Sequence, residues 1–332
     1  MAPSSQPSPQ PTPRFRINQY RRLAWIGSAV ATLLSLLGLL LCWINPTIAA
    51  PLRPGLDFTG GTQIRLERAC ASGCSALAAP DLQSRVSAVR LPADAGGGTP
   101  PSLGSASVQV LDAGRSLTLR LPALAPEQTE AVVRALDADP QVGPLRRAAD
   151  GRPEASVDTI GPTLGARVLR TSVISLLVSF VAIAAYITFT YSGVFAFLAL
   201  LCLFHDVLIT CGAFAWLGLL QGVEVDSLFA VALITVAGYS VTDTVVVYDR
   251  IREQRKTLPD LSVREQVDVA VDATLTRSLY TSFTTLLPLI ALIFFGGSTL
   301  TWFAVALTIG IAVGSWSSIG LAPTLLPLLS RR

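Results

Sequence analysis

Apolar residues gather in six long runs along this chain, and short polar connectors separate most of the runs. The runs cover residues 23–44, 172–189, 193–219, 227–247, 279–295 and 300–321. A helix that crosses a bilayer needs about 20 consecutive, mostly apolar residues. A cleaved signal peptide is the alternative for the first run, but its apolar stretch is only roughly 7–15 residues long. The pattern therefore predicts a polytopic α-helical membrane protein with six transmembrane helices.

The charges in the connectors predict which side of the membrane each one faces. Residues 221–226 carry acids but neither Lys nor Arg, whereas residues 249–277 are basic. The basic residues of the second connector include Arg250, Arg252, Arg255, Lys256 and Arg264. Short connectors rich in Lys and Arg stay in the cytoplasm. We therefore expect both termini there, with a disordered, basic N-terminus at residues 1–22 and a cytoplasmic tail at residues 326–332.

The long segment between the first two runs, residues 45–170, has a different pattern. Alternation of apolar and polar residues predicts four strands, and helical spacing predicts two helices. The strands are expected at residues 62–67, 107–112, 116–121 and 155–160, and the helices at residues 80–90 and 126–138. The resulting order, β-α-β-β-α-β, is that of the ferredoxin-like fold. We expect one extracytoplasmic α+β ferredoxin-like domain here, with a Gly- and Pro-rich loop at residues 92–105.

The remaining five runs predict a five-helix transmembrane bundle over residues 171–325. Between the fourth and fifth runs Pro259 interrupts the chain, and Ser262 and Glu265 have the spacing of a capping box. Apolar residues then recur at helical spacing, at Val263, Val267, Ala270 and Val271. This predicts an amphipathic segment within residues 250–277 that lies along the cytoplasmic face of the membrane.

The composition limits the kinds of binding and catalysis that the chain is expected to carry out. Charged residues make up 14% of the chain and apolar residues 51%, against roughly 25% charged residues in a soluble protein. The net charge of +3 is too small to indicate nucleic-acid binding. Among the five cysteines only Cys70 and Cys74 lie outside the apolar runs, and two free thiols are favoured over a local disulfide. No nucleotide-binding loop or nucleophile motif is found, so we expect no cofactor, no metal and no enzyme activity.

Asp243 is the outstanding acid inside an apolar run. Asp243 is roughly 7 Å from the cytoplasmic end of the fourth run at a rise of about 1.5 Å per residue. An ionisable group inside a span costs about 2.5–3.5 kcal/mol on insertion scales, so it needs a reason. Thr235 and Tyr239 share one helix face with it. That face is polar, and the rest of the helix is apolar.

The fifth run carries a matching stripe of Arg277, Thr281, Thr284 and Pro288. An acid and a guanidinium at equal depth on neighbouring antiparallel helices are natural partners. We therefore expect Asp243 and Arg277 to form a proton relay, with hydroxyl groups above them that hold water. A static ion pair that only locks two helices is the alternative. Further candidates for supporting the relay are His205, Asp206, Tyr239, Ser240, Thr281 and Thr284. Gly310, Gly314 and Ser318 form a row typical of close helix packing.

Several of these residues stand in motifs that resemble the SecF members of the SecD/SecF family. The motifs are Gly55-Leu-Asp57-Phe58-Thr-Gly60-Gly61, Ser156-Val-Asp158-Thr-Ile-Gly161-Pro162, His205-Asp206-Val, and Gly238-Tyr-Ser-Val-Thr-Asp243 with Tyr248-Asp-Arg-Ile-Arg252. Arg277 lies where the family has its arginine. The resemblance covers about residues 20–325. Two positions depart from the family pattern: Thr159 replaces an aromatic residue, and Thr242 stands where many members have Asn.

The resemblance implies half of an RND-type transporter, with SecD supplying the other half. It implies a role in late steps of preprotein translocation, driven by the proton-motive force, with SecYEG, SecA and YajC as further partners. Asp243 would carry the proton and Arg277 would be its partner. The location implied is the cell inner membrane, with a thylakoid membrane as the alternative in a photosynthetic cell. Two other functions remain open at this point: an RND-like exporter of lipids or small molecules, and a translocon scaffold that transports nothing.

Overall fold

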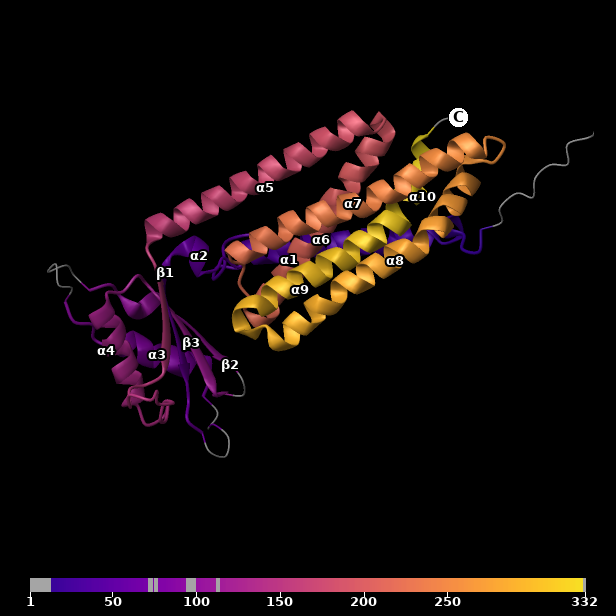
Figure 1. Ribbon diagram of the computed structural model, residues 1–332. Helices are drawn as coiled ribbons and strands as arrows, with labels where there is room; N and C mark the ends of the chain where they lie inside the picture. Colours follow the sequence, from indigo (N-terminus) through magenta and orange to yellow (C-terminus); the bar gives the residue numbers. More distant parts are fainter. Residues whose placement is uncertain (1–12, 71–73, 75–76, 94–99, 112–113, 331–332) are drawn as a thin grey trace, which may run out of the picture. The chain divides into compact units, whose positions relative to one another are not determined.

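The computed structural model describes residues 13–70, 74, 77–93, 100–111 and 114–330 (Figure 1). The chain divides into two compact units. One unit comprises Met1–Pro54 and Ser172–Arg332, and the other comprises Gly55–Thr171. The first unit is helical, and the second contains a small sheet.

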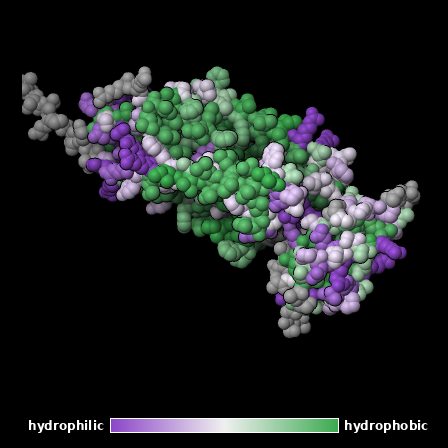
Figure 2. All heavy atoms as spheres, turned by 180° about the vertical axis from the view of Figure 1, so that it is seen from behind, coloured by the Kyte–Doolittle hydropathy of each residue, from purple (hydrophilic) through white to green (hydrophobic). Residues whose placement is uncertain are grey.

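Six helices of the described chain are long and apolar enough to cross a membrane, so the six predicted spans are confirmed. They are α1 (Arg21–Ile44), α5 (Pro162–Thr190), α6 (Gly193–Gln221), α7 (Ser227–Thr257), α8 (Val263–Phe295) and a last span over Leu300–Leu329. Hydrophobic residues cover the sides of the helical unit, and hydrophilic residues gather at its ends (Figure 2). Helix α5 begins earlier than predicted because Pro162 suits the first turn of a helix.

Helices α7 and α8 correct the prediction for residues 250–277. The capping box is present, since the Glu265 amide donates to Ser262 Oγ at 3.4 Å and the Ser262 amide donates to Glu265 Oε2 at 2.9 Å. However, α7 and α8 extend into this segment, and no separate helix lies along the membrane surface among the described residues. Val267 and Val271 are fully buried in a core that includes Tyr248. The apolar face therefore packs on protein, where the sequence pattern predicted lipid.

The last span is not one regular helix. Helix α9 (Gly297–Trp316) is followed by a π-helical turn, Ser317–Leu321, and then by α10 (Ala322–Leu329). A π-helical turn inserts an extra residue per turn, and such turns are frequent at functional sites. Its effect here is to turn two neighbouring serines, Ser317 and Ser318, into the interior of the bundle, where both are fully buried.

The N-terminal segment is more ordered than predicted. Residues 1–12 lie outside the described residues, but Ile17–Gln19 form a 3-10 turn and Ile17 is buried in the helical core. The amides of Phe15 and Asn18 donate to the carboxylates of Asp272 and Asp268 at 2.9 and 3.0 Å. These contacts fix the segment to the start of α8. At the other end of the chain, α10 extends to Leu329, into the predicted tail.

The second unit contains a four-stranded sheet in the order β2-β3-β1-β4, with every pair antiparallel. Its strands are β1 (Gly61–Glu67), β2 (Ser107–Leu111), β3 (Ser116–Leu121) and β4 (Ala155–Ile160), close to the predicted positions. Two short helices, α3 (Ala79–Ala88) and α4 (Pro126–Asp137), pack on the sheet (Figure 1). The core between them is aliphatic, with Ile64, Leu66, Leu82, Leu119 and Val132 all fully buried. Burial of each such side chain contributes about 1.5–3 kcal/mol.

The cysteine prediction is wrong. Cys70 and Cys74 form a disulfide with their Cα atoms 5.2 Å apart, which is within the usual range for a bridged pair. The rest of that loop, and parts of the predicted loop at residues 92–105 and of the turn at residues 112–115, lie outside the described residues. Gly114, at the end of that turn, has a φ of 88°, which suits glycine.

Candidate functional site

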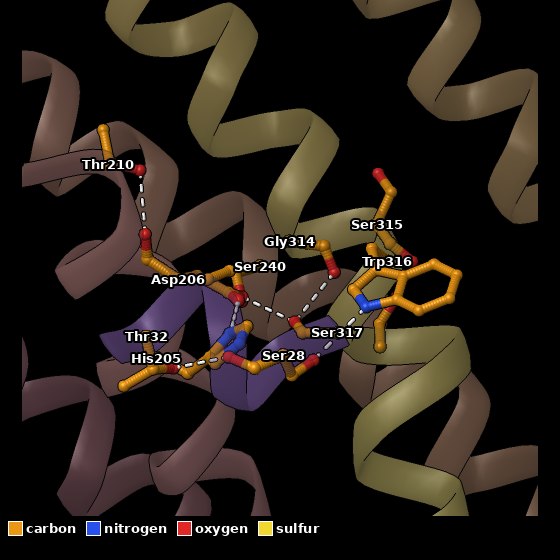
Figure 3. A network of polar contacts seen from close by, with 12 residues as sticks. Ser28, Thr32, His205, Asp206, Thr210, Ser240, Gly314, Ser315, Trp316 and Ser317 are labelled. Carbon is orange, nitrogen blue, oxygen red and sulfur yellow. Dashed lines mark hydrogen bonds and ion pairs between the residues drawn. The ribbon is translucent and has the colours of Figure 1, made fainter. Parts of the chain in front are cut away.

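Asp206 on α6 is fully buried in the helical unit (Figure 3). Its Oδ2 accepts hydrogen bonds from Ser240 Oγ on α7 and from Ser317 Oγ on the π-helical turn, each at 2.6 Å. Its Oδ1 lies 2.8 Å from Nδ1 of the neighbouring His205. A buried carboxylate is tolerated only when hydrogen bonds replace its water. Here side chains from three helices replace it.

Asp243 on α7 is a second buried acid, with 8% of its surface exposed. Its Oδ1 accepts from Ser278 Oγ on α8 at 2.9 Å. Its Oδ2 accepts from Ser318 Oγ on the π-helical turn. Each oxygen of this carboxylate therefore has a hydroxyl partner from a different helix.

Consecutive residues of the π-helical turn connect the two acids. Ser317 bonds Asp206, and Ser318 bonds Asp243. Neighbouring side chains point in different directions around a helix axis, so two serines in sequence can bond two acids on different helices. The close approach of α9 to α7 supports this arrangement. A Cβ added at Gly314 would lie only 3.2 Å from Cβ of Ser240.

More hydroxyl groups continue the network from Asp243 along α8. Ser282 Oγ lies 2.6 Å from Ser315 Oγ, and both side chains are buried. The Tyr239 hydroxyl donates to Ser282 Oγ at 3.2 Å. A hydroxyl can donate and accept at the same time. Hydroxyl groups therefore extend the polar cluster around Asp243 within an otherwise apolar bundle.

The predicted ion pair between Asp243 and Arg277 is not formed. Arg277 is exposed on α8, and among the described residues no salt bridge within 4.0 Å involves it. The neighbouring Ser278 points inward in its place. The bond from Ser278 to Asp243 shows that α7 and α8 are neighbours at this level, but the rotation of α8 directs its arginine outward.

The predicted threonine stripe also lies on the wrong face of α8. Thr281 and Thr284 are exposed and donate to backbone carbonyls of their own helix, at 2.9 and 2.8 Å. On α7, Thr235 is exposed and Tyr239 is half-buried. Sequence reasoning included Ser240 among the relay candidates but missed the roles of Ser278, Ser317 and Ser318, although one signal was available for Ser278. Thr274, Ser278 and Ser282 recur every four residues, and all three are buried.

The row of small residues in the last span has two roles. Gly310 and Gly314 allow close packing against Val236 and Ser240 of α7, as predicted. Ser318, assigned to the same packing row, instead bonds a buried acid. Thr242, where the family resemblance leads us to expect Asn, is exposed and donates to the Gly238 carbonyl at 2.8 Å. It does not bond Asp243.

The family signature residues of the second unit meet at the start of β1. Gly60 and Gly61 have φ values of 70° and 123°, and an added Cβ on Gly60 would lie 2.8 Å from Cα of Pro162. The two glycines form a tight turn that leads into β1. Asp57 and Phe58 lie in the short helix α2 (Leu56–Thr59) just before it, Asp158 is exposed on β4, and Gly161 precedes α5. Thr159 Oγ1 lies 3.1 Å from Thr62 Oγ1, so the departure from an aromatic residue forms a cross-strand contact.

No group of three or more potential metal ligands occurs in the residues that the structure describes. What the buried acids offer is proton chemistry. Each is held by hydroxyl groups that can either donate to a carboxylate or accept from a carboxylic acid. Such a site accommodates both protonation states without a large rearrangement.

Two family models match the chain. The model described as protein export membrane protein SecD/SecF, C-terminal, matches residues 144–332, and the SecD/SecF GG motif matches residues 48–71. The second match contains Gly60 and Gly61, and the first contains every residue that bonds the two buried acids.

Similar proteins and a solved structure point to the same family as the two family models. The protein translocase subunit SecF of Prochlorococcus marinus is 51% identical over 314 residues, covering 95% of each chain. That of Synechocystis sp. is 44% identical over 308 residues, covering 92% of this chain and 91% of its own. The crystal structure of SecDF from Thermus thermophilus, described as a translocon-associated membrane protein, matches with a TM-score of 0.75 and 30% identity. That match covers 95% of this chain and 38% of the SecDF chain. The two SecF relatives are named translocase subunits, and the chain belongs to the SecD/SecF family of protein export membrane proteins.

Proposed function

We propose that the chain acts as a SecF-type subunit of the Sec protein-export machinery and works with a separate SecD. Two relatives named protein translocase subunit SecF match it over nearly their whole length. The SecDF relative carries more in one chain, of which this protein spans 38%. A SecD subunit would supply the remainder. SecYEG, SecA and YajC are proposed as further partners on the family resemblance alone.

We place the proton-carrying group at Asp243, with Asp206 and His205 in support. The observation that carries this is the burial of two acids in a membrane-spanning bundle. Within the described part of the chain, their polar side-chain partners are hydroxyl groups and one imidazole. A fixed cation would hold a carboxylate in its charged form, whereas serines serve both forms. Ser240, Ser278, Ser317 and Ser318 form the surrounding cradle.

Arg277 enters the proposal in a different way from the direct partnership with Asp243 that the sequence predicted. It is adjacent to Ser278, which bonds Asp243, but its own side chain faces outward. A rotation of α8 that withdraws Ser278 would bring the guanidinium toward the carboxylate. We propose that Asp243 alternates between a serine-bonded state and an Arg277-paired state as it gains and loses its proton. Tyr239 lies on α7 with Asp243, and Thr281 and Thr284 lie on α8 with Arg277.

We propose that the second unit is a ferredoxin-like domain on the extracytoplasmic side. Its element order, β-α-β-β-α-β, and its strand order, β2-β3-β1-β4, support the fold. The basic connector between α7 and α8 supports a cytoplasmic location for that end of the bundle and for both termini. The domain would then contact SecD or the emerging preprotein. The membrane would be the inner membrane or an internal photosynthetic membrane.

The test is a matched pair of acid-to-amide variants, assayed with a SecD partner in vesicles that carry an imposed proton gradient. Asp243→Asn removes the buried acid and keeps its shape. Asp260→Asn removes an exposed acid from the connector between α7 and α8. We expect Asp243→Asn to lose gradient-dependent preprotein release, and Asp260→Asn to retain it. Release unchanged in Asp243→Asn, in a complex that still assembles, would exclude the relay.

A further inference from the structure

An open surface pocket of about 510 Å³ lies at the end of the helical unit where α1 and α8 begin. Its lining includes four arginines, Arg16, Arg21, Arg22 and Arg264, together with Asn18 and Asp268. The chain brings these residues together from two distant segments. The contacts between Asn18 and Asp268, at 3.0 Å from the backbone amide and 2.9 Å from the side chain, hold the N-terminal segment against α8.

The charge of this pocket is unbalanced. Among the described residues none of the four arginines forms a salt bridge within 4.0 Å. The one carboxylate in the lining, Asp268, already accepts from Asn18 through its Oδ1. Guanidinium groups present several N–H donors in a planar fork that matches phosphate and carboxylate oxygens. The pocket therefore has the chemistry of an anion site.

The surroundings of the pocket distinguish a lipid from a soluble anion. Arg21 is the first residue of α1, which is a membrane-spanning helix. Beyond it, Leu23 and Ile26 are 69% and 61% exposed, and Leu33 is 65% exposed. A phosphate in the pocket would thus have an apolar, lipid-facing surface directly beside it. Basic pockets at the boundary of spanning helices are typical of sites for anionic lipid headgroups.

Helix α1 adds a further element of the site. Its N-cap residue, Tyr20, makes no side-chain hydrogen bond to the first turn. The first amide groups of a helix have no partner within the helix, and the positive end of the helix dipole favours an anion. We propose that this arginine pocket binds the phosphate headgroup of an anionic phospholipid, whose acyl chains lie along the exposed face of α1. The proposal requires the membrane-spanning helices but not the proton relay.

Two double variants of the full chain test this proposal. Arg16→Gln with Arg264→Gln removes two exposed guanidinium groups from the pocket. Arg255→Gln with Lys256→Gln removes the same charge from the end of α7, outside the pocket lining. The purified proteins are titrated in neutral detergent with phosphatidylglycerol, phosphatidylcholine, inorganic phosphate and an acidic peptide, and bound ligand is counted by native mass spectrometry. Arg16→Lys with Arg264→Lys serves as the conservative control.

We expect phosphatidylglycerol to bind in preference to phosphatidylcholine, and the pocket variant to lose about tenfold or more of this affinity, since each basic group near a lipid headgroup contributes substantially. The α7 variant and the lysine variant should retain most of it. An equal loss in the pocket and α7 variants would indicate general surface attraction and overturn the proposal. Tighter binding of inorganic phosphate or of the acidic peptide would overturn it in favour of a soluble anion or an acidic protein segment. Equal binding of the two lipids would exclude it outright.

Discussion

Gly310 offers the sharpest test of the packing that positions the two acids. A Cβ added there would collide with Cγ2 of Val236 on α7 and would lie 2.7 Å from its Cγ1 and 3.0 Å from its Cβ. Carbon atoms in contact prefer separations of about 3.5–4.0 Å. Val236 is 1% exposed, and a valine in a helix has one strongly preferred rotamer. In Gly310→Ala, helices α7 and α9 must therefore move apart by about 1 Å.

The cost of that movement can be isolated with a matched variant. Gly238→Ala also replaces a helical glycine, but its Cβ would meet nothing within 4 Å. Both variants gain about 1 kcal/mol of helix propensity. Only Gly310→Ala has the overpacking cost of about 1–3 kcal/mol. We therefore expect Gly310→Ala to be less stable than Gly238→Ala by about 1–3 kcal/mol, the propensity gain being common to both.

Unfolding in mixed micelles with increasing dodecyl sulfate, followed by the fluorescence of the five tryptophans, measures this difference. The wild-type chain should lie between the two variants or close to Gly310→Ala. The same displacement separates Ser317 and Ser318 from the acids on α6 and α7, so gradient-dependent release should fall more than stability alone explains. If Gly310→Ala unfolds at the same point as Gly238→Ala, the close contact between α7 and α9 is not present in the membrane.

Three further outcomes follow from the contacts described. Ser318→Ala removes a donor from a buried carboxylate and should cost about 1–3 kcal/mol, measured by the same unfolding assay. Cys74→Ser should lower the stability of the sheet unit by about 2 kcal/mol, as expected for a short disulfide loop, and alkylation mapping should find Cys70 reactive only in that variant. Burial alone would raise the pKa of Asp139, but hydrogen bonds from the Gln141 amide and from Arg85 outweigh it and lower that pKa. The stabilisation that the ionised Asp139 gives the folded state is therefore present above the unfolded pKa of about 3.9, and it is lost as pH falls through the lower folded pKa. The variant Asp139→Asn should unfold more readily at neutral pH. In that variant, hydrogen exchange of α3 and α4 should no longer show this dependence on acid.

Local patterns predicted the elements well where a single physical rule decided the outcome. The strand at Ser116–Leu121 alternates regularly between half-buried and buried residues, and its bounds match the prediction. The six spans follow from hydropathy because the bilayer imposes the same requirement on every segment. The capping box at Ser262 was predicted because its partners lie three residues apart. Each of these features depends on residues close together in the chain.

Predictions failed where two segments had to be oriented relative to each other. Helical spacing placed Arg277 and Asp243 at equal depth, but it did not give the rotation of α8, which brings Ser278 inward. The apolar residues Val267 and Val271 have the pattern of a membrane-surface helix, yet they are buried in the same protein core as the N-terminal Ile17. A periodicity predicts that a face is apolar. It does not say whether lipid or protein covers that face.

The sequence by itself determined the number of spans, the position of the mixed α/β unit, and the presence of an acid inside the fourth span. Tertiary structure alone decided that Ser317 of the π-helical turn bonds Asp206 and Ser318 bonds Asp243. It also decided that four arginines from two distant segments of the chain share one pocket. The physical reason is the range of the interactions. Hydropathy and capping act within a segment, whereas the partners of a buried acid depend on how neighbouring helices rotate and on one extra residue in a helical turn.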